Sequence, residues 1–97
     1  MVYTARVKFE WGSNKASSNL TKHGVSFDEA TSVFSDDLFV TFADPDHSEN
    51  ERRYIILGSS NQGRLLVVAY TERSETYRII SAREANRRER KAYEDDI

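Results

Sequence analysis

The stretch that decides the fold runs from residue 64 to residue 83 and reads RLLVVAYTERSETYRIISAR. Its apolar and β-branched residues come in two runs, which a short polar segment separates. Such runs are typical of strands, and the polar segment is typical of a tight turn. The sequence therefore predicts a β-hairpin whose strands, Arg64 to Thr71 and Thr76 to Ser81, meet at a turn at Arg73 and Ser74.

The pairing within this hairpin predicts which side chains share a face, because side chains alternate along a strand. A turn at that position pairs Thr71 with Thr76 and Ala69 with Arg78. The bulkier, more apolar face is predicted to lie under helices: Leu66, Val68, Tyr70, Tyr77 and Ile79. The other face is predicted to be an open groove: Leu65, Val67, Ala69, Thr71, Thr76, Arg78 and Ile80. Arg64 falls on the packed side, and it reaches the groove only from the start of its strand or through a bulge.

Outward from the hairpin, the hydrophobic pattern predicts a compact α+β domain with the element order β-α-α-β-β-β-β-α. An antiparallel sheet with helices on one face is expected. The expected strands before the hairpin are Tyr3 to Glu10, Leu38 to Phe42 and Arg53 to Ser59. The first expected helix runs from Lys15 to His23 and is ended by Gly24. The second runs from Ser26 to Ser35 and begins with a capping box of Ser26 and Glu29. A polar last helix begins with a capping box of Ser81 and Glu84 and runs to about Glu94.

Length and composition favour one domain that spans residues 1–97. The chain has 97 residues, 38% hydrophobic and 31% charged, which is enough for one modest core. The absence of cysteine excludes disulfide scaffolds, thiolate metal sites and cysteine nucleophiles. No apolar run is longer than Leu65 to Tyr70 and no secretion signal is visible, so we expect no membrane association and a cytoplasmic location.

Charge is unevenly placed along the chain. Between Asp28 and Glu51 there are eight acidic residues and no Lys or Arg, whereas Arg52 to Lys91 holds ten basic and four acidic residues. A basic half can hold a polyanion even though the net charge of the chain is −2. A solvated surface whose two halves partly pair with each other is the alternative, and the pattern leaves both open.

Several motifs follow one another along the chain. In the first half they are Phe9-Glu10-Trp11, Asn19, Lys22-His23-Gly24-Val25-Ser26-Phe27-Asp28-Glu29-Ala30 and Val33-Phe34. In the second half they are Asp46-His47-Ser48, Glu51-Arg52-Arg53-Tyr54, Gly63 to Val68, Tyr70-Thr71, Arg73, Arg78-Ile79-Ile80-Ser81-Ala82-Arg83, Ala85, Glu89-Arg90 and Tyr93. In this order and spacing the chain resembles the BrnT family of toxins. Gly12 departs from the family pattern, because many relatives carry an acidic residue there.

The resemblance implies a RelE-like fold and the toxin of a type II toxin–antitoxin pair. Such a toxin is a ribonuclease whose substrate is RNA. Its partner is a cognate BrnA-like antitoxin, whose ribbon-helix-helix part binds the operator DNA of the shared operon. The toxin would then meet DNA only indirectly, through the antitoxin, and no cofactor is expected.

Metal-free RNA cleavage uses the 2′-hydroxyl of the substrate as nucleophile, so the protein must move protons and stabilise charge on the phosphate. Arginine forks suit phosphate oxygens, and histidine suits proton transfer near neutral pH. The predicted catalytic residues are Arg78, Arg64, His47 and His23. The predicted substrate-binding residues are Arg83, Arg53 and Lys22. No histidine or cysteine spacing indicates a metal site.

Each candidate also has a structural alternative. Arg78 is either a phosphate ligand, a member of an ion pair or simply exposed. Arg83, expected in the first turn of the last helix, meets either an anion at free backbone amides or a carboxylate. His47 is either a general acid or an exposed loop residue, and His23 is either a proton carrier or a cation at a helix C-terminus. Lys22 contacts either phosphate or water.

Two further points stay open at this stage. Glu10 is a candidate base, and Trp11 either stacks on a nucleobase or anchors the core. The competing function is a non-catalytic module that binds a DNA-binding partner and tunes its repression. RNA cleavage in the presence of a chelator, and its loss on Arg78→Ala, would separate the two functions.

Overall fold

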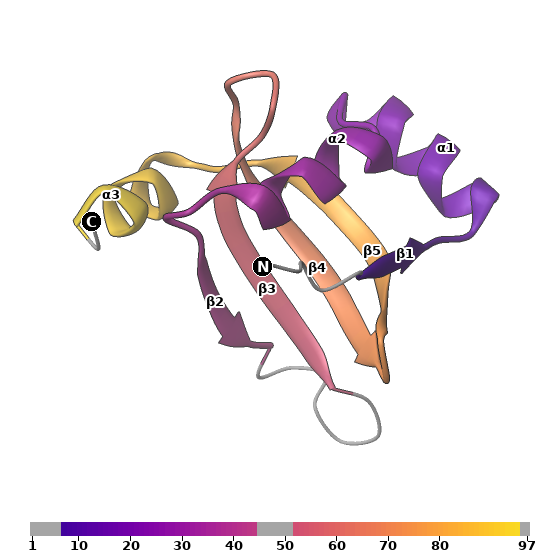
Figure 1. Ribbon diagram of the computed structural model, residues 1–97. Coiled ribbons are helices and arrows are strands. Elements are labelled where there is room, and N and C mark those ends of the chain that lie inside the picture. Colours follow the sequence, from indigo (N-terminus) through magenta and orange to yellow (C-terminus); the bar gives the residue numbers. More distant parts are fainter. Residues whose placement is uncertain (1–6, 45–51, 96–97) are drawn as a thin grey trace.

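The computed structural model describes residues 7–44 and 52–95 (Figure 1). The elements follow the order β1 (Lys8–Glu10), α1 (Ser13–His23), α2 (Phe27–Ser32), the 3₁₀ turn η1 (Val33–Ser35), β2 (Val40–Ala43), β3 (Arg53–Ser59), β4 (Leu65–Arg73), β5 (Thr76–Glu84) and α3 (Arg87–Asp95). This confirms the predicted α+β class and element order. Among the described residues, no helix has the length and apolar character needed to cross a lipid bilayer.

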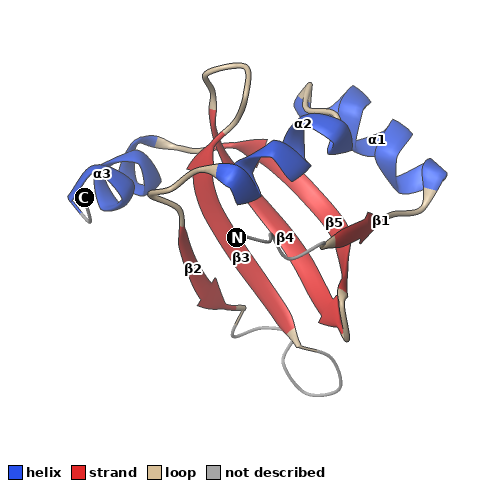
Figure 2. Ribbon diagram, in the orientation of Figure 1, coloured by secondary structure: helices blue, strands red, loops and turns tan. Residues whose placement is uncertain are grey.

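The five strands form one sheet in the order β1-β5-β4-β3-β2 (Figure 2). The neighbours from β2 to β5 are antiparallel, but β1 pairs with β5 in parallel, so the sheet is mixed rather than antiparallel throughout. The physical reason is the connection: α1 and α2 carry the chain from the β1 edge of the sheet towards the β2 edge. A helical crossover leaves the direction of β1 free, whereas a tight turn would have reversed it.

One face of the sheet carries the main core. The stripe of α2 and η1 packs there against Leu66, Val68, Tyr70 and Ile79, as the sequence predicts. The buried members of the stripe are Phe27, Ala30 and Val33, with Phe34 half-buried beside them. Trp11 packs edge-on against Phe27 with ring centroids 5.8 Å apart, which makes it a core anchor.

Asn19 of α1 fastens this helical layer to β5. Its side-chain amide donates to the backbone carbonyls of Val25, at 3.0 Å, and Ala82, at 2.8 Å. Its side-chain oxygen accepts from the Ala82 amide at 3.1 Å. Asn19 is buried, so these bonds satisfy groups that water does not reach. Helix α1 also ends as predicted, at Gly24, whose backbone is in the left-handed region with φ 70°.

A smaller cluster lies on the other side of the sheet, because Leu57, Leu65 and Val67 alternate with the residues of the main core. Ala85 and Tyr93 pack against it, so α3 covers part of the face that was predicted to be open. The Tyr93 hydroxyl donates to Asp36 Oδ2 at 2.7 Å and anchors the helix. No residue of α3 is itself buried.

The hairpin of β4 and β5 differs from its predicted register in two ways. The turn lies at Ser74 and Glu75, one residue later than predicted, and Ser74 takes a positive φ of 51°. Each residue of β4 therefore pairs with a residue of β5 two positions later than predicted, so that Thr71 pairs with Arg78 rather than with Thr76. A shift of two leaves the facing side unchanged, and Arg78 stays on the side opposite the main core.

A β-bulge further along β5 changes the faces after residue 80. Tyr70 pairs with Ile79 and Ala69 pairs with Ser81, so Ile80 is an extra residue. Beyond the bulge Ala82 turns into the main core, and Arg83 turns to the side of Val67.

The last helix therefore starts later than predicted. β5 continues to Glu84, and the reciprocal capping pair is not Ser81 and Glu84 but Asn86 and Glu89. In α2, Ser26 accepts from the Glu29 amide at 3.0 Å as predicted, but the Glu29 carboxylate does not return to Ser26. It turns instead towards Arg64 and Ser60.

Candidate active site on the open face of the sheet

Four polar side chains line up across four strands on the face opposite the main core. Arg53 of β3 pairs with Thr71 of β4, Thr71 pairs with Arg78 of β5, and Arg78 pairs with Glu10 of β1. Register partners project to the same side of a sheet, so these residues form a continuous row. We call Arg53, Thr71, Arg78 and Glu10 the polar row. It crosses the end of the sheet to which the arrow of β4 points (Figure 2).

Arg78 stands in the polar row as predicted and is not sealed beneath a helix. Its Nη1 donates to Glu10 Oε2 at 3.1 Å, and 37% of the Arg78 side chain is exposed, against 43% for Glu10. Gly12 follows close by, since a Cβ there would lie 3.6 Å from Arg78 Nη2. The predicted ion pair and the predicted exposure are thus both present. Phosphate binding by Arg78 stays a prediction.

The Arg53 end of the polar row holds buried polar atoms. Arg53 Nε lies 3.8 Å from Asp44 Oδ2, beyond hydrogen-bonding distance. Thr71 is only 2% exposed, and its hydroxyl has no hydrogen-bond partner within the described parts of the chain; the same holds for Arg53 Nε. Buried donors without a partner are uncommon and cost free energy. The sequence placed Thr71 on the predicted groove face but gave neither Thr71 nor Asp44 a role, because only the strand register sets them beside Arg53.

Arg64 lies at the opposite end of the sheet, directly before β4. Its guanidinium donates to both carboxylate oxygens of Glu29, with Nε to Oε2 at 3.0 Å, and also to Glu84 and to the Gly24 carbonyl. This hydrogen-bonded pair lowers the pKa of the Glu29 carboxyl, which is 3% exposed. The structure therefore does not bring Arg64 together with Arg78.

Arg83 is on β5 and not in the first turn of α3, which corrects its predicted position. The bulge turns it towards α3, where Nη1 and Nη2 each donate to the Glu89 carboxylate at 2.8 Å. This pair lowers the pKa of Glu89. Of the two predicted outcomes for Arg83, the structure shows the carboxylate contact.

Of the remaining predicted residues, Lys22 and His23 do not join the polar row. Lys22 and His23 end α1 and are exposed, next to Gly24, whose carbonyl Arg64 contacts. They therefore lie at the Arg64 end of the sheet. His47 lies outside the described residues. In residues 7–44 and 52–95, no three His, Cys, Asp or Glu side chains gather as metal ligands.

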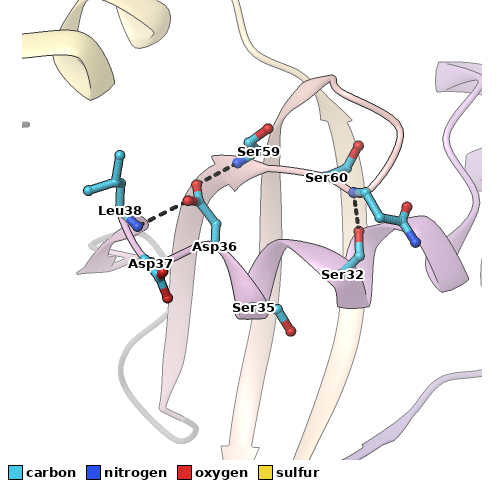
Figure 3. A pocket seen from close by; sticks show the side chains of 8 residues that line it. Ser32, Ser35, Asp36, Asp37, Leu38, Ser59 and Ser60 are labelled. Carbon is cyan, nitrogen blue, oxygen red and sulfur yellow. Dashed lines mark hydrogen bonds between the residues drawn. The ribbon is translucent and has the colours of Figure 1, made fainter.

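A separate open hollow lies beside η1 and is lined mostly by serine and aspartate (Figure 3). Asp36 accepts from the amides of Leu38, at 3.0 Å, and Ser59, at 2.8 Å, and the Ser32 hydroxyl accepts from the Asn61 amide at 2.9 Å. Burial opposes ionisation of Asp36, but these bonds outweigh it and lower the pKa of Asp36. These polar groups already have partners, so the hollow is explained as a joint between η1, β2 and the end of β3.

Comparison with known proteins identifies the class. The family described as the ribonuclease toxin, BrnT, of type II toxin–antitoxin systems matches residues 11–89, which is most of the chain, so the protein belongs to the BrnT family. Among solved structures it is similar to the Brucella abortus ribonuclease toxin BrnT, with a TM-score of 0.66 and 24% sequence identity. That alignment covers 84% of this chain and 100% of the Brucella chain, and it supports the fold. No curated protein sequence matches.

Proposed function

We propose that this BrnT-family toxin is an endoribonuclease that cleaves RNA without a metal ion and that the polar row is its active site. The observation that carries the proposal is the alignment of Arg53, Thr71 and Arg78 on an accessible face, with Glu10 bonded to Arg78. The two guanidinium groups supply donors for the oxygens of one phosphate. The Thr71 hydroxyl and Arg53 Nε, which have no hydrogen-bond partner within the described residues, are buried in the same row.

In the proposed reaction the 2′-oxygen of the substrate forms a bond to phosphorus as the bond to the 5′-oxygen breaks. The Glu10 carboxylate accepts the proton of the 2′-hydroxyl, and its bond to Arg78 holds it beside the phosphate. Arg78 and Arg53 stabilise the negative charge that develops on the phosphate oxygens. The 5′-oxygen leaves with a proton from a general acid, for which His47 remains the sequence-based candidate. The products are a 2′,3′-cyclic phosphate and a free 5′-hydroxyl.

Arg64, His23 and Lys22 have no part in this proposed reaction. Arg64 is held by two carboxylates at the far end of the sheet, where it ties α2 to β4 and β5. We assign Arg64 a structural role. Lys22 and His23 lie at the same end of the sheet and therefore not at the proposed phosphate site. Arg83, paired with Glu89, holds β5 to α3.

The partners in this proposal are RNA and a cognate antitoxin. A cytoplasmic toxin of this kind needs a protein that covers the polar row in the resting cell, and an acidic segment complements two arginines. We propose a BrnA-like antitoxin with a ribbon-helix-helix part that binds operator DNA, so that the complex represses its own operon.

RNA cleavage by purified protein, in the presence of EDTA, tests the catalytic proposal. Arg78→Ala should lower the cleavage rate by about 10²–10³-fold, the effect of losing one charge-stabilising donor. Glu10→Gln should lower it by about 10²–10⁴-fold, the contribution of one positioned base. Arg88→Ala is the matched control, because Arg88 is an exposed arginine of α3 outside the polar row. It should cleave like the unmodified protein.

The same assay decides the competing function. A protein that binds its partner tightly, cleaves no RNA and tolerates Arg78→Ala would be a non-catalytic interaction module. Equal loss of cleavage in Arg78→Ala and Arg88→Ala would show that total positive charge, rather than the polar row, matters. Circular dichroism of each variant shows whether it is folded.

A further inference from the structure

Phe42 of β2 is an exposed aromatic residue on the face that carries the polar row. It pairs with Ile55, which pairs with Ala69, and Ile55 packs against the smaller cluster on that face. Phe42 is 47% exposed and belongs to neither core cluster of the described residues. Within residues 7–44 and 52–95 this ring therefore makes no core contact, and it is exposed on the face of the proposed active site.

The ring lies within reach of the phosphate-binding end of the polar row. Asp44 follows two residues after Phe42 on the same face, and the Asp44 amide donates to the Arg53 carbonyl at 2.9 Å. Phe42 and Arg53 are therefore diagonal neighbours on adjacent strands. Such neighbours are about 7–8 Å apart, a distance that aromatic and long side chains span.

We propose that Phe42 is a nucleobase-binding residue, on which a base flanking the cleaved phosphate stacks. Single-stranded RNA is held by basic groups that follow the backbone and by aromatic rings on which bases stack. Arg53 and Phe42 place one group of each kind side by side. This inference rests on the proposed function, because it takes the polar row as the phosphate site. It adds a contact to the base, which none of the four residues of that row provides.

A protein surface is the other class of ligand that an exposed ring on an edge strand suits. RNA is favoured because the ring shares its face with the polar row and is the diagonal neighbour of Arg53. The other exposed ring of this region, Phe39, lies elsewhere. A Cβ added at Gly58 would lie 3.3 Å from the Phe39 Cβ and 2.9 Å from a methyl of Val33. Phe39 therefore belongs to the side of η1 and the main core.

Binding of a short single-stranded RNA with 2′-O-methyl groups throughout tests the proposal, because this probe lacks the nucleophilic hydroxyl. Fluorescence anisotropy at fixed salt gives its Kd. Phe42→Ala should raise the Kd by about 5- to 150-fold, the usual effect of losing one base–aromatic stack. Phe42→Trp should bind like the unmodified chain, because it retains a stacking surface. Phe39→Ala is the matched control, since it is 44% exposed and lies on the other side. Its Kd should not change.

A probe with the same backbone but no bases separates stacking from backbone binding. The unmodified protein and Phe42→Ala should bind this abasic probe equally. The proposal is overturned if Phe42→Ala leaves the Kd of the complete probe unchanged, or if the loss is the same on the abasic probe. Retained RNA binding with lost antitoxin binding would assign the ring to the protein interface instead.

Failure of this proposal is distinguishable from failure of the proposed function. Cleavage that depends on Arg78 while Phe42→Ala binds normally removes only the stacking contact. Base-dependent binding through Phe42 without any cleavage of unmodified RNA removes only the nuclease.

Discussion

Replacing Asn19 with alanine is expected to lower the free energy of unfolding by about 3 kcal/mol. The side chain makes three hydrogen bonds to backbone groups of Val25 and Ala82, and each is worth about 1 kcal/mol. Ala82 is buried, so neither its amide nor its carbonyl gains a water molecule in exchange. For a domain of this size the loss corresponds to about 12–24 °C in Tm.

Urea unfolding followed by tryptophan fluorescence measures this loss. Trp11 is the single tryptophan, and it packs against the main core, so its emission reports whether the helical layer is attached. Asn14→Ala is the control, because Asn14 is an exposed asparagine of the same helix. It should change the free energy of unfolding by less than about 0.5 kcal/mol. A loss in Asn19→Ala no larger than in the control would refute the assignment of Asn19 as the fastening between α1 and β5.

Asn19→Asp tests which atoms of the residue 19 side chain donate hydrogen bonds and which accept them. The substitution keeps the oxygen that accepts from Ala82 but sets a second oxygen against the carbonyls of Val25 and Ala82. This contact disfavours the charged form, so folding is expected to raise the pKa of the new carboxyl. The protonated form has an O–H to donate, so the loss of stability relative to the unmodified protein should be smallest at low pH. This loss should grow as pH rises through the raised pKa. A loss that is independent of pH would contradict the hydrogen-bond assignment.

Three further substitutions test other parts of the fold. Gly58→Ala should destabilise the protein by about 1–3 kcal/mol in urea unfolding, because the new Cβ would lie 2.9 Å from a methyl of Val33; a neutral result would contradict the close packing of η1 on β3. The pKa of Glu29 is lowered in the folded state, so the stability it contributes is present above its ordinary value of 4.5 and is lost as pH falls through the lowered pKa. In Glu29→Gln the free energy of unfolding should therefore fall less steeply as pH is lowered below 4.5. An unchanged pH dependence would show that other groups cause the loss of stability in acid. Tyr93→Phe removes the bond to Asp36 and should speed amide hydrogen exchange in α3 while leaving the main core protected; unchanged exchange in α3 would mean that other contacts hold it. Because the pKa of Tyr93 is raised to about 12, mainly by that bond, the anchor should persist in mildly alkaline solution.

The strands and the main core could be predicted because local and tertiary preferences agree there. β3 has the predicted bounds, and the apolar alternation of β4 correctly places Leu66 and Val68 under the helices. The direction of β1 could not be predicted, since nothing in a short strand before two helices determines which way it runs beside β5. The later turn and the bulge at Ile80 were also beyond prediction, because many residues tolerate either conformation.

The candidate site was predicted in part. The alternation along the hairpin placed Arg78 on the right face, and a shift of two in register left that placement intact. Arg53 was chosen without a geometric reason, and the register supplies one by aligning it with Thr71. The role of Arg64 as an ion-pair centre could not be seen, because Glu29 is 35 residues away in the sequence and reaches it only across the fold.

The parallel pairing of β1 and β5 bears on synthesis of the protein. Glu10 and Arg78 are separated by 68 residues, and among the described strands β1 pairs with β5 alone. A nascent chain on the ribosome therefore cannot assemble this pair until the last strand has emerged. On the proposed function, a product that ends before Arg78 would lack the polar row and cleave no RNA, so the order of synthesis itself would delay the activity until β5 is complete.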